Sequence, residues 1–104
     1  MLYLVTGKWI ENPVISDEEA VKIWEHKVRP SLKSLEKMVE DDLIAGGIFA
    51  GQRRGIFIAD ASSHDEIANI LSDLPFWDRI EWTVEPLESF RSAHDRERRI
   101  MERL

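Results

Sequence analysis

The chain contains no cysteine, which excludes a disulfide framework, a thiolate metal site and a cysteine nucleophile. It also lacks any stretch approaching the roughly 20 consecutive apolar residues that a membrane-spanning helix needs. Basic residues are in the minority, with 14 Lys and Arg against 20 Asp and Glu and a formal net charge of −6. Such an acidic balance disfavours a nucleic-acid partner. Because the absence of cysteine fits a reducing compartment, we predict a cytoplasmic protein with neither a nucleic-acid nor a membrane partner.

The composition is that of one compact domain. Hydrophobic residues make up 43% of the 104 positions and charged residues 33%, the balance of an ordinary globular domain. A domain this short buries only about two-thirds of the surface that its unfolded chain exposes. We therefore expect a second copy of the chain to cover more apolar surface, in a homodimer or higher homo-oligomer.

The first half of the chain predicts a strand, a long helix and a hairpin. Residues 2–10 are rich in strand-forming types. Ser16 and Glu19 have the spacing of a capping box, and the helix that they begin is expected to run to about residue 41. Pro30 predicts a kink within this helix rather than a break, because the apolar stripe keeps its phase across it: Val21, Trp24, Val28, Leu32, Leu35, Val39 and Leu43. Residues 44–51 and 55–60 then predict two strands joined by a tight turn.

The second half predicts a short helix, a strand and a charged tail. Ser63 and Glu66 form a second capping box, and Pro75 follows the helix that they begin. Residues 79–86 alternate between apolar and polar types, as in a half-buried strand. Residues 87–104 are mostly charged and keep only a weak helical stripe.

This order predicts an α+β fold. It is the βαββαβ arrangement of a ferredoxin-like subunit with a C-terminal extension. Such a subunit has an antiparallel sheet with helices on one face, and its other face needs a cover. Two sheets packed face to face would form a dimeric α+β barrel. We assign residues 1–88 to the barrel domain and residues 89–104 to a helical tail that packs on a neighbouring subunit.

Several short motifs resemble those of the muconolactone delta-isomerase family. They are the start Met1-Leu2-Tyr3, the pair Ala50-Gly51, Asp60, Ser63, the run Leu74-Pro75-Phe76-Trp77 and the alternating strand Ile80-Glu81-Trp82-Thr83-Val84. The resemblance implies a homo-oligomeric barrel and a cofactor-free isomerisation of an unsaturated lactone that carries a carboxylate, in aromatic degradation. The chain differs from the family pattern before Ala50-Gly51, where residues 43–48 are Leu-Ile-Ala-Gly-Gly-Ile in place of a polar stretch with Arg, His and Trp.

Isomerisation of an unsaturated lactone needs a base that moves a proton between two carbons. Glu25 is one candidate, because it lies at the border of the apolar stripe beside Trp24, where burial would raise the pKa of its carboxyl group. Glu81 in the last strand is the other candidate. Each also has a non-catalytic interpretation. Glu25 could pair with Arg29 on the helix surface, and Glu81 could simply belong to the polar face of its strand.

Substrate binding has four candidate residues. Arg53 in the hairpin turn and Lys8 at the end of the first strand could bind a carboxylate. Trp24 and Trp82 could line a pocket for a flat ligand, since the helix stripe and the apolar strand face are expected to meet. The histidines lack the spacing of metal ligands, so we predict neither a metal nor an organic cofactor.

The leading functional hypothesis is a muconolactone isomerase-like enzyme that moves a proton within a small unsaturated lactone or related carbonyl compound. Two alternatives remain open. One is a non-catalytic oligomer of the same superfamily, which binds a small molecule or is purely structural. The other is a cofactor-independent oxygenase, which oxygen consumption would distinguish from the first two.

Overall fold

The computed structural model describes residues 1–11 and 14–104. The strands and helices follow one another along the chain in the order β1 (Leu2–Trp9), α1 (Asp17–Ile23), η1 (Trp24–Val28), α2 (Arg29–Glu40), β2 (Ile44–Ile48), β3 (Arg54–Asp60), α3 (His64–Ser72), η2 (Trp77–Arg79), β4 (Ile80–Leu87) and α4 (Phe90–Glu102). Because α1, η1 and α2 follow one another without a break, they form one long helix.

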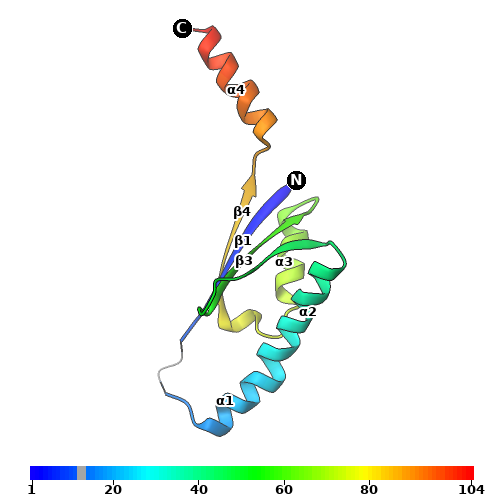
Figure 1. Cartoon of the computed structure of the whole chain (residues 1–104), viewed down its shortest axis with the longest axis vertical. Coiled ribbons are helices and arrows are strands. Elements are labelled where there is room, and N and C mark those ends of the chain that lie inside the picture. The colour runs from blue at the N-terminus through cyan, green and yellow to red at the C-terminus, as the bar shows by residue number, and fades with distance from the viewer. Residues whose placement is uncertain (12–13) are drawn as a thin grey trace.

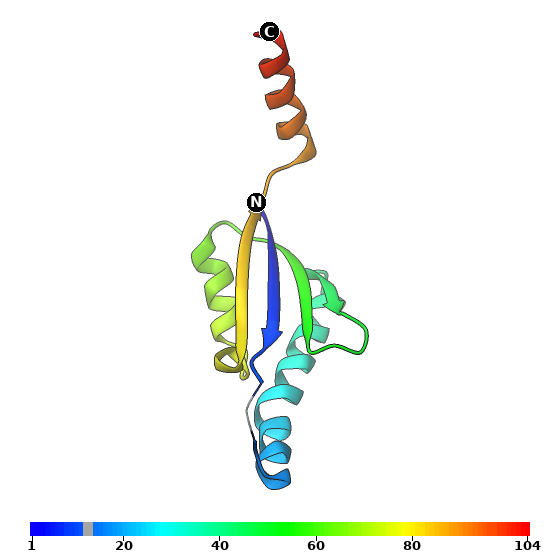
Figure 2. The ribbon, with the colours of Figure 1, turned by 90° about the vertical axis from the view of Figure 1, so that its left-hand side faces the viewer.

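The strands form a single antiparallel sheet in the order β2-β3-β1-β4. Helices α2 and α3 cover one face of this sheet (Figure 1). Figure 2 looks onto the opposite face, which no element in the described part of the chain covers. The structure therefore confirms the predicted α+β class, the βαββαβ order and the antiparallel sheet with its helices on one face.

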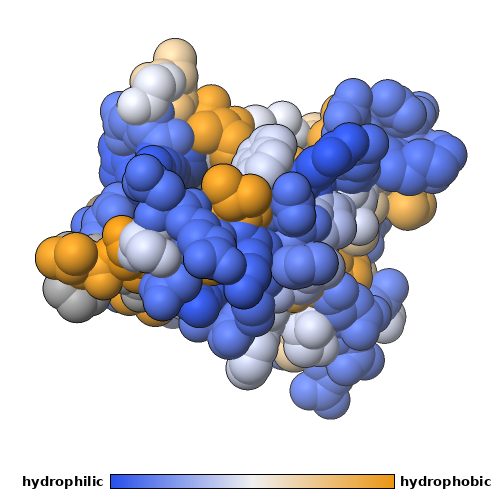
Figure 3. Space-filling model, turned by 90° about the horizontal axis from the view of Figure 1, so that it is seen from below, coloured by the Kyte–Doolittle hydropathy of each residue, from blue (hydrophilic) through white to orange (hydrophobic). Residues whose placement is uncertain are grey.

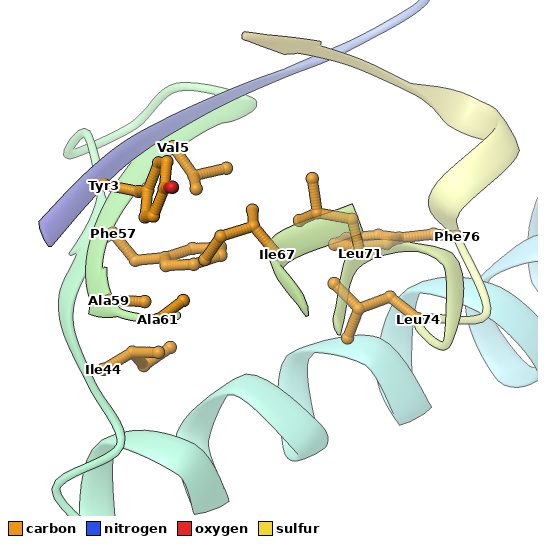
Figure 4. Packing of buried hydrophobic residues seen from close by; sticks show 10 residues of the cluster. All are labelled: Tyr3, Val5, Ile44, Phe57, Ala59, Ala61, Ile67, Leu71, Leu74 and Phe76. Carbon is orange, nitrogen blue, oxygen red and sulfur yellow. The ribbon is translucent and has the colours of Figure 1, made fainter. Parts of the chain in front are cut away.

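The hydrophobic core lies between the sheet and these helices (Figure 4). Val5 is fully buried, and it stands opposite Phe57 on one neighbouring strand and Val84 on the other. Since side chains alternate along a strand, these three residues face the helices together. Ile67 and Leu71 of α3 fill the space opposite them.

Both predicted helix starts are confirmed. The Ser16 hydroxyl accepts a hydrogen bond from the Glu19 N–H at 3.1 Å, and the Ser63 hydroxyl accepts one from the Glu66 N–H at 3.3 Å. The Glu66 carboxylate accepts two further bonds, from the N–H and the hydroxyl of Ser62. These bonds favour the ionised form and hold the pKa of Glu66 below its usual value.

Pro30 changes the winding of the long helix rather than ending it. The segment before it, η1, is π-helical, and the Arg29 N–H donates to the Trp24 carbonyl five residues back. Proline has no N–H to bond the carbonyl four residues earlier, and its ring collides with that carbonyl in a regular α-helix. One wider turn accommodates both effects, and it is the form that the predicted kink takes.

The apolar stripe of the long helix is buried only in part. Leu32, Leu35 and Met38 pack against the core, whereas Val21 and Trp24 are about half exposed. The helix begins beyond the end of the sheet (Figure 1), so its first turns have no strand beneath them. Figure 3 views this end of the molecule and shows apolar groups within a mostly hydrophilic surface.

Strand β2 is shorter than predicted, and helix α4 follows the last strand. Strand β2 ends at Ile48 rather than at Gly51, because residues 49–53 form the turn. Helix α4 extends away from the sheet (Figure 1), and Phe90 and Leu104 are almost fully exposed. None of the helices in the described part of the chain is both long and apolar enough to cross a membrane.

Candidate functional site

An open groove runs between helix α3 and strand β4. Its volume of about 520 Å³ lies within the range of small-molecule sites. Strand β4 is at the edge of the sheet, so the groove follows a free strand edge and is open to solvent on that side. It is lined by His64, Ala68, Asn69, Leu71, Ser72, Trp77, Trp82 and Val84.

Helix α3 contributes one complete face to the groove. His64, Ala68 and Ser72 are spaced four residues apart, which places them on one stripe of the helix. The buried residues Ile67 and Leu71 anchor the adjacent stripe in the core. Since Ala68 has the smallest side chain of the groove stripe, the middle of the groove has the most room.

Trp82 forms the opposite wall. It follows the alternation of β4, so it faces the helices together with Ile80 and Val84. Its indole N–H donates to the Trp77 carbonyl at 3.1 Å, and its ring meets the Phe76 ring edge-on at 6.1 Å between centroids. The indole is thus fixed with both its polar atom and its ring engaged.

The long helix holds the turn that supports Trp82. The hydroxyl of Ser31, a fully buried residue, donates to the Lys27 carbonyl at 2.6 Å and accepts from the Phe76 N–H at 2.9 Å. Nearby, the Lys27 ammonium donates to the Asp78 carboxylate at 3.0 Å. This bond holds the pKa of Asp78 below its usual value. One wall of the groove is therefore held from the long helix, by Ser31 of α2 through Phe76 and by Lys27 of η1 through Asp78.

His64 lies at the far end of the groove from Trp77. Its imidazole meets the ring of the buried Tyr3 edge-on, at 5.1 Å between centroids. Further along α3, the Ser72 hydroxyl donates to the Asn69 carbonyl at 3.2 Å. Of the lining residues, His64 alone carries an imidazole, whose two ring nitrogens can donate or accept hydrogen bonds.

Of the six predicted site residues, Trp82 lines this groove and the other five do not. Lys8 and Glu81 are register partners on the uncovered face of the sheet. Glu81 and Trp82 are consecutive strand residues, so their side chains lie on opposite faces. One chain therefore does not bring this carboxylate and this indole into one cavity.

The remaining predicted residues lie around the end of the sheet where β1 ends. Arg53 pairs with Glu11 at 3.5 Å, and both side chains are largely exposed. Trp24 and Glu25 lie in η1 and are exposed, because the helix there begins beyond the sheet. The burial that we expected for Glu25 is thus absent within one chain, and so is the burial of Trp24.

Seven of the eight lining residues were not among the predicted site residues: His64, Ala68, Asn69, Leu71, Ser72, Trp77 and Val84. The four-residue spacing of His64, Ala68 and Ser72 is present in the sequence. It gives no apolar periodicity because none of the three is a large apolar residue. Within residues 1–11 and 14–104, no group of three or more His, Asp and Glu side chains is placed to hold a metal ion.

The family model of muconolactone delta-isomerase matches residues 1–93. The chain belongs to this family. Among curated proteins, none has a sequence that matches it. The family match confirms the resemblance seen in the sequence, and it leaves only the last eleven residues, most of α4, unmatched.

A solved structure shares the fold. It is the 5-chloro-2-hydroxyhydroquinone dehydrochlorinase of Burkholderia phenoliruptrix in complex with 2,5-dihydroxybenzoquinone, with a TM-score of 0.60 and 21% sequence identity. The similarity covers 88% of the present chain and 98% of the other. At this identity the comparison supports the α+β fold of the family member described here.

Proposed function

We propose that this protein catalyses a cofactor-free proton-transfer isomerisation of a small unsaturated lactone or related carbonyl compound. The reaction takes place in the groove between α3 and β4. Membership of the muconolactone delta-isomerase family, matched over residues 1–93, supports the reaction class. The single observation that supports the place is the fixed indole of Trp82, which offers a flat apolar wall beside the small residue Ala68.

The groove suits a flat ring with polar substituents. An aromatic wall favours stacking of an unsaturated ring, and the Asn69 carboxamide at the rim is a donor for a carbonyl or carboxylate oxygen. Glu25 and Glu81 remain the bases predicted from the sequence, with Arg53 and Lys8 as anion-binding residues. Because none of these four lines the groove of its own chain, a second copy would have to bring them there.

We also propose that the protein forms a homodimer through the uncovered face of the sheet, as a dimeric α+β barrel requires. This face carries a band of apolar residues from three strands, and Leu2 and Ile58 in it are 48% and 36% exposed. Leu4 and Ile58 are register partners at its centre, and Leu2 and Leu87 extend it towards one end. Burying such a band stabilises an association by about 25 cal/mol per Å² of apolar surface.

Solvent exchange tests the function. Purified protein is mixed with muconolactone and simple unsaturated lactones in D₂O, and proton NMR follows deuterium entering the ring carbons. We expect exchange with at least one compound. Binding without exchange would contradict the isomerase and favour the non-catalytic alternative, whereas oxygen consumption would favour the oxygenase.

A substitution tests whether the groove is the site. Ala68→Leu fills the middle of the groove with three more carbon atoms at an exposed position, so we expect exchange and binding to be lost while the fold is kept. Ala20→Leu makes the same change on the exposed face of α1 and serves as the control. Equal activity of the two variants would place the reaction elsewhere.

The dimer is tested by mass in solution. We expect light scattering to give twice the chain mass of 12.1 kDa, or a multiple of that value. Ile58→Glu places a charge in the centre of the apolar band and should reduce the mass towards one chain. A monomeric wild type would refute the dimer.

A further inference from the structure

Among the residues that line the groove, one carries a side chain of the kind that most often moves protons in enzymes, the imidazole of His64. Six of the eight lining residues carry no titratable group at all, and the Ser72 hydroxyl is already bonded to the Asn69 carbonyl. We propose that His64 is the catalytic residue that moves the proton. This assignment rests on the proposed function, and it gives the role of base to a residue other than Glu25 and Glu81.

The position of His64 fits a ligand held over Ala68. Successive residues of an α-helix rise about 1.5 Å, so His64 and Ala68 are about 6 Å apart along α3. A five-membered ring stacked between Ala68 and the β4 wall therefore lies within reach of the imidazole. The Tyr3 ring against which the imidazole packs is buried and fixed in the core, which limits the orientations that His64 can adopt.

The chemistry balances without a cofactor. Neutral His64 takes a proton from the γ-carbon of an α,β-unsaturated lactone, and the C–H electron pair forms a new double bond as the carbonyl oxygen becomes an enolate. The imidazolium then returns the proton to the α-carbon, and the enolate electrons restore the carbonyl. Substrate and product have the same formula, and His64 ends as it began. Donors at the groove rim would stabilise the enolate oxygen in between.

The test compares binding with exchange in His64→Gln. Glutamine keeps a polar side chain of similar length but does not take a proton from carbon. We expect the affinity for muconolactone, measured by tryptophan fluorescence, to change less than about tenfold, while exchange falls by about 100-fold or more. His64→Ala should show the same loss and recover part of its exchange in added imidazole, which a merely structural role for His64 would not allow.

His26→Gln is the matched control, because His26 is an exposed histidine of the long helix, outside the groove. Its exchange should equal that of the wild type. Exchange retained in His64→Gln, or lost only in Glu25→Gln or Glu81→Gln, would overturn the assignment while leaving the isomerase intact. A wild type that shows no exchange with any lactone would instead refute the proposed function, and with it any catalytic role for His64.

Discussion

Replacing Ser31 with alanine tests whether the long helix holds the groove wall through one buried hydroxyl. Ser31 is fully buried, and it is the acceptor for the Phe76 N–H, which is itself buried. Alanine removes this acceptor at a residue that solvent does not reach. The variant therefore leaves the buried Phe76 N–H without its partner and also removes the hydrogen bond to the Lys27 carbonyl.

The expected loss can be estimated from two opposing effects. A buried N–H without a partner costs about 1–3 kcal/mol, whereas alanine is a better helix former than serine by about 0.5 kcal/mol. We expect the free energy of unfolding to fall by about 1.5 kcal/mol. For a chain of this length that corresponds to a decrease in melting temperature of about 7 °C.

Urea denaturation at one fixed protein concentration measures the difference. Ser34→Ala is the control, since Ser34 is exposed in the same helix and its replacement should be neutral or stabilising by about 0.5 kcal/mol. The reasoning is refuted if the two variants unfold within about 0.5 kcal/mol of each other, because the hydrogen bond to Phe76 would then contribute nothing measurable.

Three further predictions follow from particular contacts. In Gly46→Ala the new Cβ would overlap the Ile56 carbonyl oxygen, whereas in Gly47→Ala it would meet nothing within 4 Å. Chemical denaturation should show that Gly46→Ala lowers the free energy of unfolding by about 2 kcal/mol or more and that Gly47→Ala changes it little. The hydrogen bond from Lys27 lowers the pKa of Asp78 below its usual 3.8. The contribution of this bond to the free energy of unfolding is therefore present above that pH, and it is lost as the pH falls through the folded-state pKa. Asp78→Asn should thus lower stability by about 0.5 kcal/mol at pH 7, and equal stability of variant and wild type at pH 7 would contradict this. Deleting residues 89–104 should reduce the number of chains per particle in solution if the tail packs on a neighbouring subunit, and an unchanged number of chains would refute that packing.

The elements of the fold were predictable because their signals are local. Ser16 and Ser63 cap helices through bonds to residues three positions away, and alternation along β4 is a property of neighbouring residues. Pro30 acts on the carbonyls of the preceding turn, so its effect on the helix was also visible. The antiparallel sheet then followed from the βαββαβ order and short connections.

The site was less predictable because it depends on where separate elements meet. Periodicity placed Trp24 and Trp82 on apolar faces and predicted that both line a pocket. The long helix begins beyond the sheet, however, and leaves Trp24 half exposed. The sequence indicated only that His64 lies in the first turn of a helix. Its place in one groove with Val84 and against Tyr3 depends on how α3 packs on the sheet.

The sequence by itself determined the fold class, the helix starts and the family, since these rest on spacing, capping and short motifs. Only the tertiary structure decided which side chains share a cavity. Glu81 and Trp82 are adjacent in sequence but lie on opposite faces of the sheet, while Ser31 and Phe76 are 45 residues apart and hydrogen-bonded. The physical reason is that burial and proximity belong to the packed arrangement of all elements, which no local pattern contains.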